Sequence, residues 1–287
     1  MSSAGGFWYR HPRLRLGALL TAPMLWLVVL YLGSLAVLIA SSFWTVDSLT
    51  GALIKQPTLQ NFITLITTPV YRTVALRTLG IAILVTLIDL ALALPLSFFA
   101  AKVLRSRGAR YALIIAVTMP LWAGYLVKGY AWRVMLDTNG VVDWALAPLG
   151  LSGPGLGLPA TIIALAYLWL PFMVLPIYAG LERMPESLLD ASSDLGAGAG
   201  RTFRSVVLPI IWPSIVAGSI FTFSLTLGDY IMVKIVGGTT QMFANIVYDN
   251  IGVANNLPFA AAAALFPIVV IIVYLLLVRR TGALENL

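Results

Sequence analysis

The sequence predicts an all-α membrane protein with six transmembrane helices, on the evidence of its composition and of six long apolar stretches. Of its 287 residues, 60% are apolar and only 10% are charged, and the mean hydropathy is +0.95. A soluble domain carries a charge on about a quarter of its residues, so this composition excludes a soluble enzyme, a disordered chain and a collagen-like fibre. Cysteine is absent and the only histidine is His11. Disulfide scaffolds, thiol catalysis and Cys/His zinc sites are therefore excluded, and we expect no metal site and no nucleic-acid partner.

Each of the six apolar stretches is long enough to cross a bilayer, whose core of about 30 Å needs roughly 20 helical residues. They cover residues 16–40, 78–101, 111–135, 159–181, 206–228 and 257–278. Asp89 is the only charge in the second stretch, and Lys128 and Arg133 lie in the third, which runs over 111–127 and continues over 129–135. The first stretch is too long for a cleavable signal peptide and no small-x-small pattern follows it. We therefore expect it to be a retained helix.

The distribution of charge predicts the orientation of these helices, because Lys and Arg collect on the cytoplasmic side of membrane proteins. With both termini inside, twelve of the 18 Lys and Arg lie in the inner segments. Five lie in the outer segments, where five acids balance them. The whole net charge of +7 is then on the inner side, and five successive loops agree with this topology. We expect cytoplasmic N- and C-termini.

The segments between the apolar stretches indicate how the chain is organised. The outer segments 41–77 and 229–256 are long enough for short helices on the membrane surface, and the Gly/Pro-rich stretch 148–158 predicts a turn. The expected organisation is an N-terminal segment over 1–15, a first helix over 16–40, an outer loop over 41–77, a core of five helices over 78–278 with an inner loop over 182–205, and a C-terminal tail over 279–287.

The inner loop 182–205 contains a short predicted helix. Pro185 suits the first turn of a helix, Glu186 follows where the positive end of the helix dipole favours an acid, and Gly196 fits just past the end. A lipid-bound helix usually has a polar face rich in Lys and Arg, whereas this loop is acidic. Docking to another protein is therefore favoured over the alternative of a helix resting on lipid headgroups.

Two faces of the predicted inner helix can be distinguished. Leu188, Ala191 and Leu195 repeat at the spacing of one apolar stripe. Asp190 and Asp194, four residues apart, share another face, and such a pair mildly destabilises an isolated helix. A partner that binds this acidic face would offset that cost.

The same loop carries a spaced motif. Asp-Ala-Ser at 190–192 is followed by three residues, Gly196, nine residues and Val-Val-Leu-Pro at 206–209. This pattern resembles the signature of the permease subunits of type I binding-protein-dependent ABC importers, which reads Glu-Ala-Ala, three residues, Gly, nine residues and Ile-x-Leu-Pro. Both gaps match, and the departures, Asp for Glu, Ser for Ala and Val for Ile, are conservative. The resemblance implies the type I permease fold, in which this short helix couples the permease to a cytoplasmic ATPase.

The residues that the resemblance assigns to coupling lie in and around this helix. They are Glu186, Leu188, Leu189, Asp190, Ala191, Asp194, Leu195 and Gly196. Three further segments resemble the spermidine/putrescine branch of the family, namely 125–132, 170–178 and 253–259, and the likeness extends from about residue 61 to residue 278. A polyamine is therefore the expected solute, with ferric iron, a phosphonate, an opine or an amino-acid-like solute as alternatives.

The chain has no G-x-x-x-x-G-K-[ST] phosphate-binding loop. We expect it to be a transport subunit and not an enzyme, to bind no cofactor itself, and to depend on a partner ATPase for ATP and Mg²⁺. The resemblance implies a complex in the bacterial inner membrane with a second permease, two copies of the ATPase and an external substrate-binding protein. It also implies alternating access driven by ATP. A heterodimer of two different permeases is expected.

Four residues are candidates for a substrate pathway. Asp229 and Tyr230 end the fifth span, and a polyamine needs carboxylates for its ammonium groups and aromatic faces for its methylenes and charge. Trp169 adds a face from the fourth span. An Asp at the end of a helix that contacts water is the plain alternative for Asp229. Asp89 lies in mid-membrane, where a carboxylate is costly unless it is paired or faces water. The structural alternatives to a pathway role for Asp89 are a pair with a polar group of the partner subunit and a protonated acid.

Lys128 and Arg133 lie at the outer end of the third span, where long basic side chains usually extend to the interface. A lysine on the substrate route would argue against a polycation as solute unless an acid such as Asp229 neutralised it.

Two rival classes of membrane protein are less favoured. An intramembrane aspartyl protease lacks the required Gly-x-Gly-Asp around Asp229, and a secondary transporter would usually show two related halves.

Overall fold

The computed structural model describes residues 12–47 and 49–279, and most of them are helical. The helices are α2 (Pro12–Trp26), α3 (Gly33–Ser41), α4 (Gln60–Thr67), α5 (Pro69–Phe98), α6 (Arg107–Trp122), α7 (Tyr125–Leu136), α8 (Val141–Leu146), α9 (Leu158–Arg183), α10 (Ser187–Asp194), α11 (Ala199–Thr202), α12 (Leu208–Gly228), α13 (Ile231–Val236), α14 (Phe243–Gly252) and α15 (Leu257–Arg279). π-Helical turns extend three of the long helices over Leu27–Leu32, Phe99–Val103 and Phe203–Val207. A short antiparallel hairpin pairs β1 (Thr45–Val46) with β2 (Leu53–Ile54).

Six spans are present in the described chain if one bent helix pair is counted as a span. Five helices are long and apolar enough to cross a membrane, over Leu19–Ser41, Pro69–Val103, Leu158–Arg183, Ala199–Gly228 and Leu257–Arg279. The second begins at Pro69, nine residues before the predicted start, because Pro69 opens α5 and the helix then continues without a break. The N-terminal segment predicted over 1–15 and the tail predicted over 279–287 lie largely outside the described residues.

The third predicted span differs from the expectation, because it is broken rather than continuous. The pair α6 and α7 bends by 99° at Ala123 and Gly124. Beyond the break, α7 packs closely on α13: a Cβ at Gly129 would lie 2.6 Å from Cδ1 of Ile235. The Arg133 guanidinium also donates a hydrogen bond to the carbonyl oxygen of Ile235 at 3.1 Å. These contacts with a segment some hundred residues away direct α7 out of line with α6.

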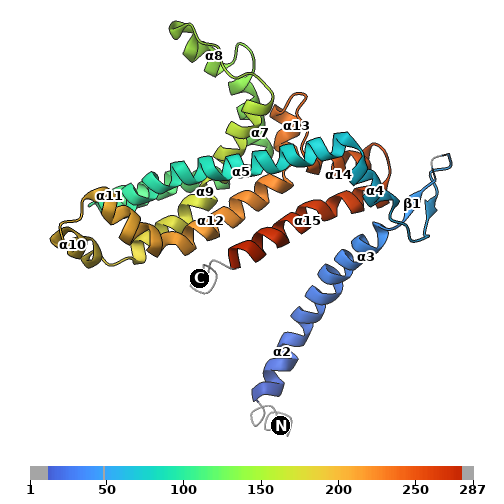
Figure 1. The fold of residues 1–287 in the computed structure, drawn as a ribbon, viewed down its shortest axis with the longest axis horizontal. Helices are drawn as coiled ribbons and strands as arrows, with labels where there is room; N and C mark the ends of the chain where they lie inside the picture. Colours follow the sequence, from blue (N-terminus) through green and yellow to red (C-terminus); the bar gives the residue numbers. More distant parts are fainter. Residues whose placement is uncertain (1–11, 48, 280–287) are drawn as a thin grey trace, which may run out of the picture.

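The core of the molecule is formed by α5, α9 and α12, which run side by side (Figure 1). Small residues allow α9 and α12 to approach closely, as is common where membrane helices pack. A Cβ at Gly180 would lie 2.3 Å from the Ser214 hydroxyl oxygen, and one at Gly218 would lie 2.8 Å from the sulfur of Met173. The helices α9 and α12 therefore belong to one tightly packed unit.

Short elements cover the two ends of the core. Figure 1 shows α10 and α11 at one end and α4 and α14 at the other, so the inner loop and the predicted outer segments lie at opposite ends, as the topology requires. The side chain of Asn61 at the start of α4 donates hydrogen bonds to the carbonyl oxygens of Ser42 and Trp44 at 2.9 and 2.8 Å. These bonds tie α4 to the end of α3 and to the hairpin.

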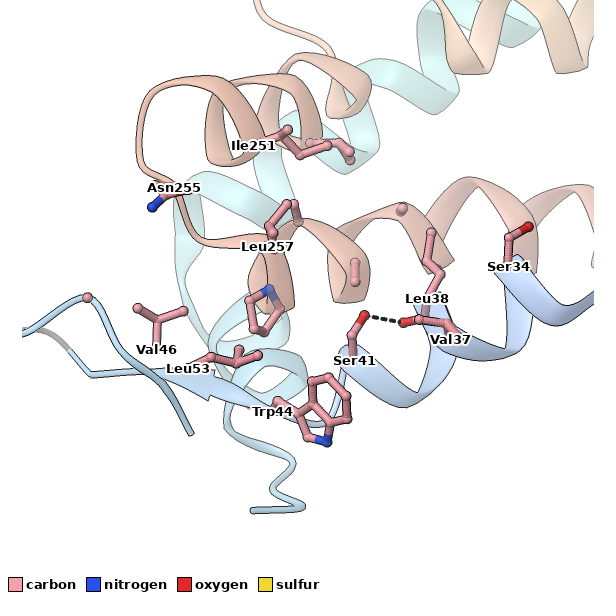
Figure 2. Close-up of a pocket in the computed structure, with 16 residues that line it drawn as sticks. Ser34, Val37, Leu38, Ser41, Trp44, Val46, Leu53, Ile251, Asn255 and Leu257 are labelled. Carbon is pink, nitrogen blue, oxygen red and sulfur yellow. Dashed lines mark hydrogen bonds between the residues drawn. The ribbon is translucent and has the colours of Figure 1, made fainter. Parts of the chain in front are cut away.

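The first helix stands apart from the bundle. α2 and the π-helical turn after it extend away from the other helices, and only the end of α3 meets α15 (Figure 1). An apolar groove of about 480 Å³ lies at this junction, between α3, the hairpin, α14 and α15. Figure 2 shows Val37 and Leu38 of α3 beside Leu257 at the start of α15. The first predicted span is therefore confirmed as a helix that makes few contacts within its own chain.

The helix α8 and the turn after it form an outer projection (Figure 1). The carboxylate of Asp143 accepts hydrogen bonds from the backbone N–H groups of Asn139 and Gly153, and these bonds hold the pKa of Asp143 below its usual value. The predicted turn over 148–158 is present, with left-handed backbone at Gly150 and Gly155. Only glycine adopts that conformation without strain.

The Gly218→Ala substitution should destabilise the core, because the added methyl group meets the sulfur and backbone of Met173. Overpacking of this kind costs about 1–3 kcal/mol. Gly80→Ala is the matched control, since a Cβ at this exposed position of α5 has no atom within 4 Å. Thermal unfolding of the purified protein should show a lower midpoint for Gly218→Ala and an unchanged or higher midpoint for Gly80→Ala. Equal midpoints for the two variants would contradict this account of the core.

Candidate functional site

A cavity of about 270 Å³ lies where α12 ends and α13 begins. Its walls come from α7, α9, α12 and α13, so it opens at the end of the core opposite to α10. The residues that line it are Tyr125, Trp169, Ser224, Leu225, Gly228, Asp229, Tyr230 and Ile231. Three of the four predicted pathway residues, Asp229, Tyr230 and Trp169, are thus brought together in one site.

Asp229 is the only ionisable acid in the lining of this cavity. Its side chain is buried, with 7% of the residue exposed. One carboxylate oxygen accepts a hydrogen bond from the Tyr125 hydroxyl, and the other accepts one from the backbone N–H of Met232 at 3.0 Å. Asp229 is therefore largely enclosed by protein at the end of α12, with its remaining exposure toward the cavity. The Asp229 carboxylate joins the end of α12 to α7 and to the first turn of α13.

Aromatic rings form much of the remaining wall. The ring centroids of Tyr125 and Trp169 lie 6.4 Å apart, and Phe172 follows at 6.0 Å from Trp169. The indole N–H of Trp169 is buried without a hydrogen-bond partner among the described residues. A buried donor of this kind carries an energetic cost until a partner reaches it. The site therefore offers a carboxylate, aromatic faces and one unused N–H donor.

Tyr125 is the residue of this site that sequence reasoning missed. It lies in the segment 125–132 that resembles the polyamine branch, but no sequence pattern places it beside Asp229, 104 positions away. The neighbouring Lys128 does not line the cavity, and its ammonium group lies 5.8 Å from the centre of the Tyr125 ring. Lys128 therefore does not contact the cavity directly, but its charge lies behind the Tyr125 wall and opposes the charge of a cationic solute.

Asp89 occupies a different environment from Asp229. It lies within α5, is fully buried, and neither carboxylate oxygen has a hydrogen-bond partner among the described residues. It does not line the Asp229 cavity. Because this chain alone encloses Asp89 completely, a polar group of a partner subunit does not reach it in this conformation. A protonated acid, or a residue that another conformation exposes, are the interpretations that stay open.

The short helix predicted in the inner loop is present, but it begins at Ser187, so Pro185 precedes the first turn and Glu186 is the N-cap. α10 covers Ser187–Asp194, and Gly196 follows in left-handed backbone with a φ of +73°. Leu189 packs against the core, and the buried Ser192 hydroxyl bonds the Thr202 hydroxyl at 2.8 Å. Lys102, at the end of the second span, donates to the carbonyl oxygen of Met184 just before α10, at 2.7 Å. The loop is therefore fixed to the core on one side only.

The other side of α10 is open. At 100° per residue, the face opposite to Leu189 and Ser192 carries Asp190, Ala191 and Asp194, and all three are exposed. The predicted apolar stripe flanks this face, with Leu188 40% exposed and Leu195 88% exposed. An apolar side chain exposed to that extent, beside two acids, is typical of a surface that a partner covers.

The helical bundle, the open inner helix and the outer cavity define a membrane permease. Residues 82–282 match the family described as "Binding-protein-dependent transport system inner membrane component". The chain belongs to this family. It is a membrane-spanning permease of an ABC importer, a transport subunit and not an enzyme.

Two relatives from Escherichia coli (strain K12) cover almost the whole chain. The inner membrane ABC transporter permease protein YdcU is 41% identical over 100% of this chain and 96% of its own length. The spermidine/putrescine transport system permease protein PotB is 30% identical over 91% of this chain and 95% of its own length. Each likeness covers more than nine tenths of the chain, so it is not confined to one motif.

Solved structures of low sequence identity share the fold. A chain of a bacterial ABC transporter involved in the import of the acidic polysaccharide alginate superposes with a TM-score of 0.73 at 17% identity, covering 96% of this chain and 97% of that one. A chain of the MetNI methionine ABC transporter, in an inward-facing conformation, gives a TM-score of 0.57 at 17% identity over 73% and 93% of the two chains. The predicted type I importer permease fold is therefore confirmed.

Removal of the Tyr125 hydroxyl should destabilise the outer end of the bundle. Tyr125→Phe leaves the buried Asp229 carboxylate without one of its two partners, and an unsatisfied buried polar group costs about 1–3 kcal/mol. Tyr130→Phe, on an exposed position of the same helix, is the control. We expect a lower thermal unfolding midpoint for Tyr125→Phe alone. A midpoint unchanged from the parent protein would show that the bond does not hold the site.

Proposed function

We propose that this chain forms, with a second permease, the membrane pathway of a polyamine importer, with spermidine or putrescine as the solute. The observation that carries the proposal is the composition of the outer cavity. Asp229 provides the negative charge for an ammonium group, while Tyr125, Trp169 and Tyr230 provide faces for methylenes and for cation–π contact. The spermidine/putrescine permease PotB, at 30% identity over nearly the full length, supports the same solute class.

The alternative solutes need other chemistry from a pathway. A phosphonate would need basic side chains, and ferric iron would need several hard oxygen ligands. The described lining has no Lys or Arg and offers one carboxylate, which is itself held by Tyr125 and Met232. A flexible alkylammonium fits this lining better than either of these solutes.

The open face of α10 is the proposed coupling surface. Its exposed acids and flanking leucines would dock into a groove of a cytoplasmic ATPase, two copies of which would hold the ATP and Mg²⁺. A second, different permease and an external substrate-binding protein complete the proposed complex. The excess of Lys and Arg on the α10 side supports cytoplasmic N- and C-termini.

Alternating access is the proposed mechanism. ATP binding would close the ATPase dimer and move α10, and the tightly packed α9 and α12 would transmit that movement to the outer cavity. Opening of the cavity would expose Asp229 to the solute that the binding protein delivers, and ATP hydrolysis would restore the inward-facing state. The close contact at Gly218 and Met173 supports transmission by a rigid pair of helices.

The solute class is tested by reconstituting the complete complex with its binding protein and measuring ATP hydrolysis. We expect spermidine or putrescine to stimulate hydrolysis, while a phosphonate, ferric iron and an amino acid do not. Stimulation by one of the latter, with no response to polyamines, would overturn the polyamine proposal and leave the permease fold intact.

Asp229→Asn should lower transport much more than it lowers assembly. Asparagine keeps the size of the side chain and an oxygen for the Met232 N–H, but it removes the charge that an ammonium group needs. Charge-assisted hydrogen bonds contribute about 1.5–3 kcal/mol, so uptake should fall roughly tenfold or more. The matched control is Asp137→Asn, on the outer side but off the cavity. Equal loss of transport and of complex assembly would instead indicate a structural role for Asp229.

Ala191→Arg should uncouple the permease from its ATPase. A large charged side chain at the centre of the open face of α10 would block docking, and the loss of one central contact costs about 1.4 kcal/mol or more, a factor of ten. Ser193→Arg makes the same change on the flank of the same helix and is the control. Co-purification of the ATPase and solute-stimulated hydrolysis should fall about tenfold for Ala191→Arg only. If both variants behave alike, α10 does not dock through this face.

A further inference from the structure

A second cluster of charged and aromatic side chains lies next to the outer cavity, between α13 and α14. The ammonium nitrogen of Lys234 lies 2.6 Å from a carboxylate oxygen of Asp249 and 4.0 Å from the centre of the Tyr248 ring. The Tyr230 ring stacks on Tyr248 with centroids 4.8 Å apart. The Lys234 ammonium group therefore contacts one carboxylate and the face of one tyrosine ring, and Tyr230 packs on that ring; Asp249, Tyr248 and Tyr230 together form the cage.

This cage is continuous with the Asp229 cavity through Tyr230, which belongs to both. The side chains of Lys234 and Asp249 are 40% and 37% exposed, so solvent reaches the cage directly. The Asn245 side chain donates to the carbonyl oxygen of Tyr230 at 3.1 Å and fixes the backbone between the two sites. Only the Tyr230 side chain would thus separate a cation in the cage from the cavity.

A contribution to the stability of the fold does not explain the ion pair between Lys234 and Asp249 well. An ion pair between half-exposed side chains contributes little to stability, because solvent screens it. α13 is already held by the Asn245 bond to Tyr230, by the Arg133 bond to Ile235 and by the close approach of Gly129. The cage adds little to that attachment, although its residues have the chemistry that recognises a primary ammonium group.

We propose that Asp249 and the ring of Tyr248, on which Tyr230 stacks, form an entry subsite for a primary alkylammonium group, which the Lys234 side chain occupies until solute displaces it. The lysine side chain is itself an ammonium group on a four-carbon stem, and putrescine is a four-carbon chain with an ammonium group at each end. An arriving ammonium group takes the place of Lys234 on Asp249 and Tyr248, and the freed end then reaches Asp229 past Tyr230. This inference rests on the proposed polyamine function.

The order of events follows from the geometry. Displacement of Lys234 requires only rotation of an exposed side chain, with no movement of α13 or α14. The deeper carboxylate is held by Tyr125 and Met232, so it becomes available only when the outer end opens. The outer cage therefore receives the solute first, and Asp229 receives it after opening.

Thermal unfolding of the assembled complex tests the subsite directly, with butylammonium and putrescine as the probes. In the Lys234→Ala variant the cage is empty, so the unfolding midpoint should rise with probe concentration, because a ligand that binds the folded state stabilises it. The probe concentration that gives a set rise in the unfolding midpoint should be roughly tenfold lower than in the parent complex, where the tethered lysine competes for the same partners. The Lys234→Ala/Asp249→Asn double variant and neutral 1-butanol should give no rise.

Two results would overturn the subsite: no rise with Lys234→Ala, or the same rise in the parent, single and double variants. Lys234→Ser serves as a second empty-cage variant if Lys234→Ala does not assemble. The measurement involves no transport, so it is independent of the solute assay. If the parent complex does not transport polyamines but the binding result holds, the proposed function is wrong and the subsite stands. If the complex transports polyamines but the binding result fails, only the subsite is wrong.

Discussion

The outer end of the molecule depends on one buried carboxylate. Asp229 accepts a hydrogen bond from Tyr125 on α7 and another from the first turn of α13, while its own backbone ends α12. The helix α7 and the consecutive helices α12 and α13 therefore meet at a single charged group. In a membrane such a group is costly unless it is satisfied, so the same bonds that stabilise this end also leave the charge at the edge of a cavity.

The end of the bundle where α10 lies is built differently. The helix α10 is attached through Leu189, Ser192 and Thr202 and leaves its acidic face open. Between the two ends, α9 and α12 pack so closely that Gly180 and Gly218 have no room for a methyl group. A closely packed pair of helices thus lies between the open inner surface of α10 and the outer cavity.

Much of the fold could be predicted from the sequence, because helix length and charge placement are local signals. Five uninterrupted spans, the presence of a short helix in the inner loop and the turn before α9 are confirmed, whereas α10 begins two residues after Pro185. The 99° bend at Ala123 and Gly124 could not be predicted, since contacts of Gly129 and Arg133 with Ile235 direct α7. Tyr125 was missed for the same reason: its bond to Asp229 depends on the tertiary fold. The roles of Asp89 and of the α10 face stay predictions.

If solute passes through the Asp229 cavity, a single thiol in the cavity wall should change its accessibility during transport. The chain contains no cysteine, so Ser224→Cys places a unique thiol in the cavity wall, and Ser219→Cys places one on the same helix beside Tyr274 and off the cavity. The measurement is the rate of reaction with a membrane-impermeant thiol reagent in the assembled complex. We expect the Ser224→Cys rate to rise with ATP and binding protein and to fall when spermidine is added, while Ser219→Cys does not respond. A Ser224→Cys rate that ignores both ATP and solute would contradict the account.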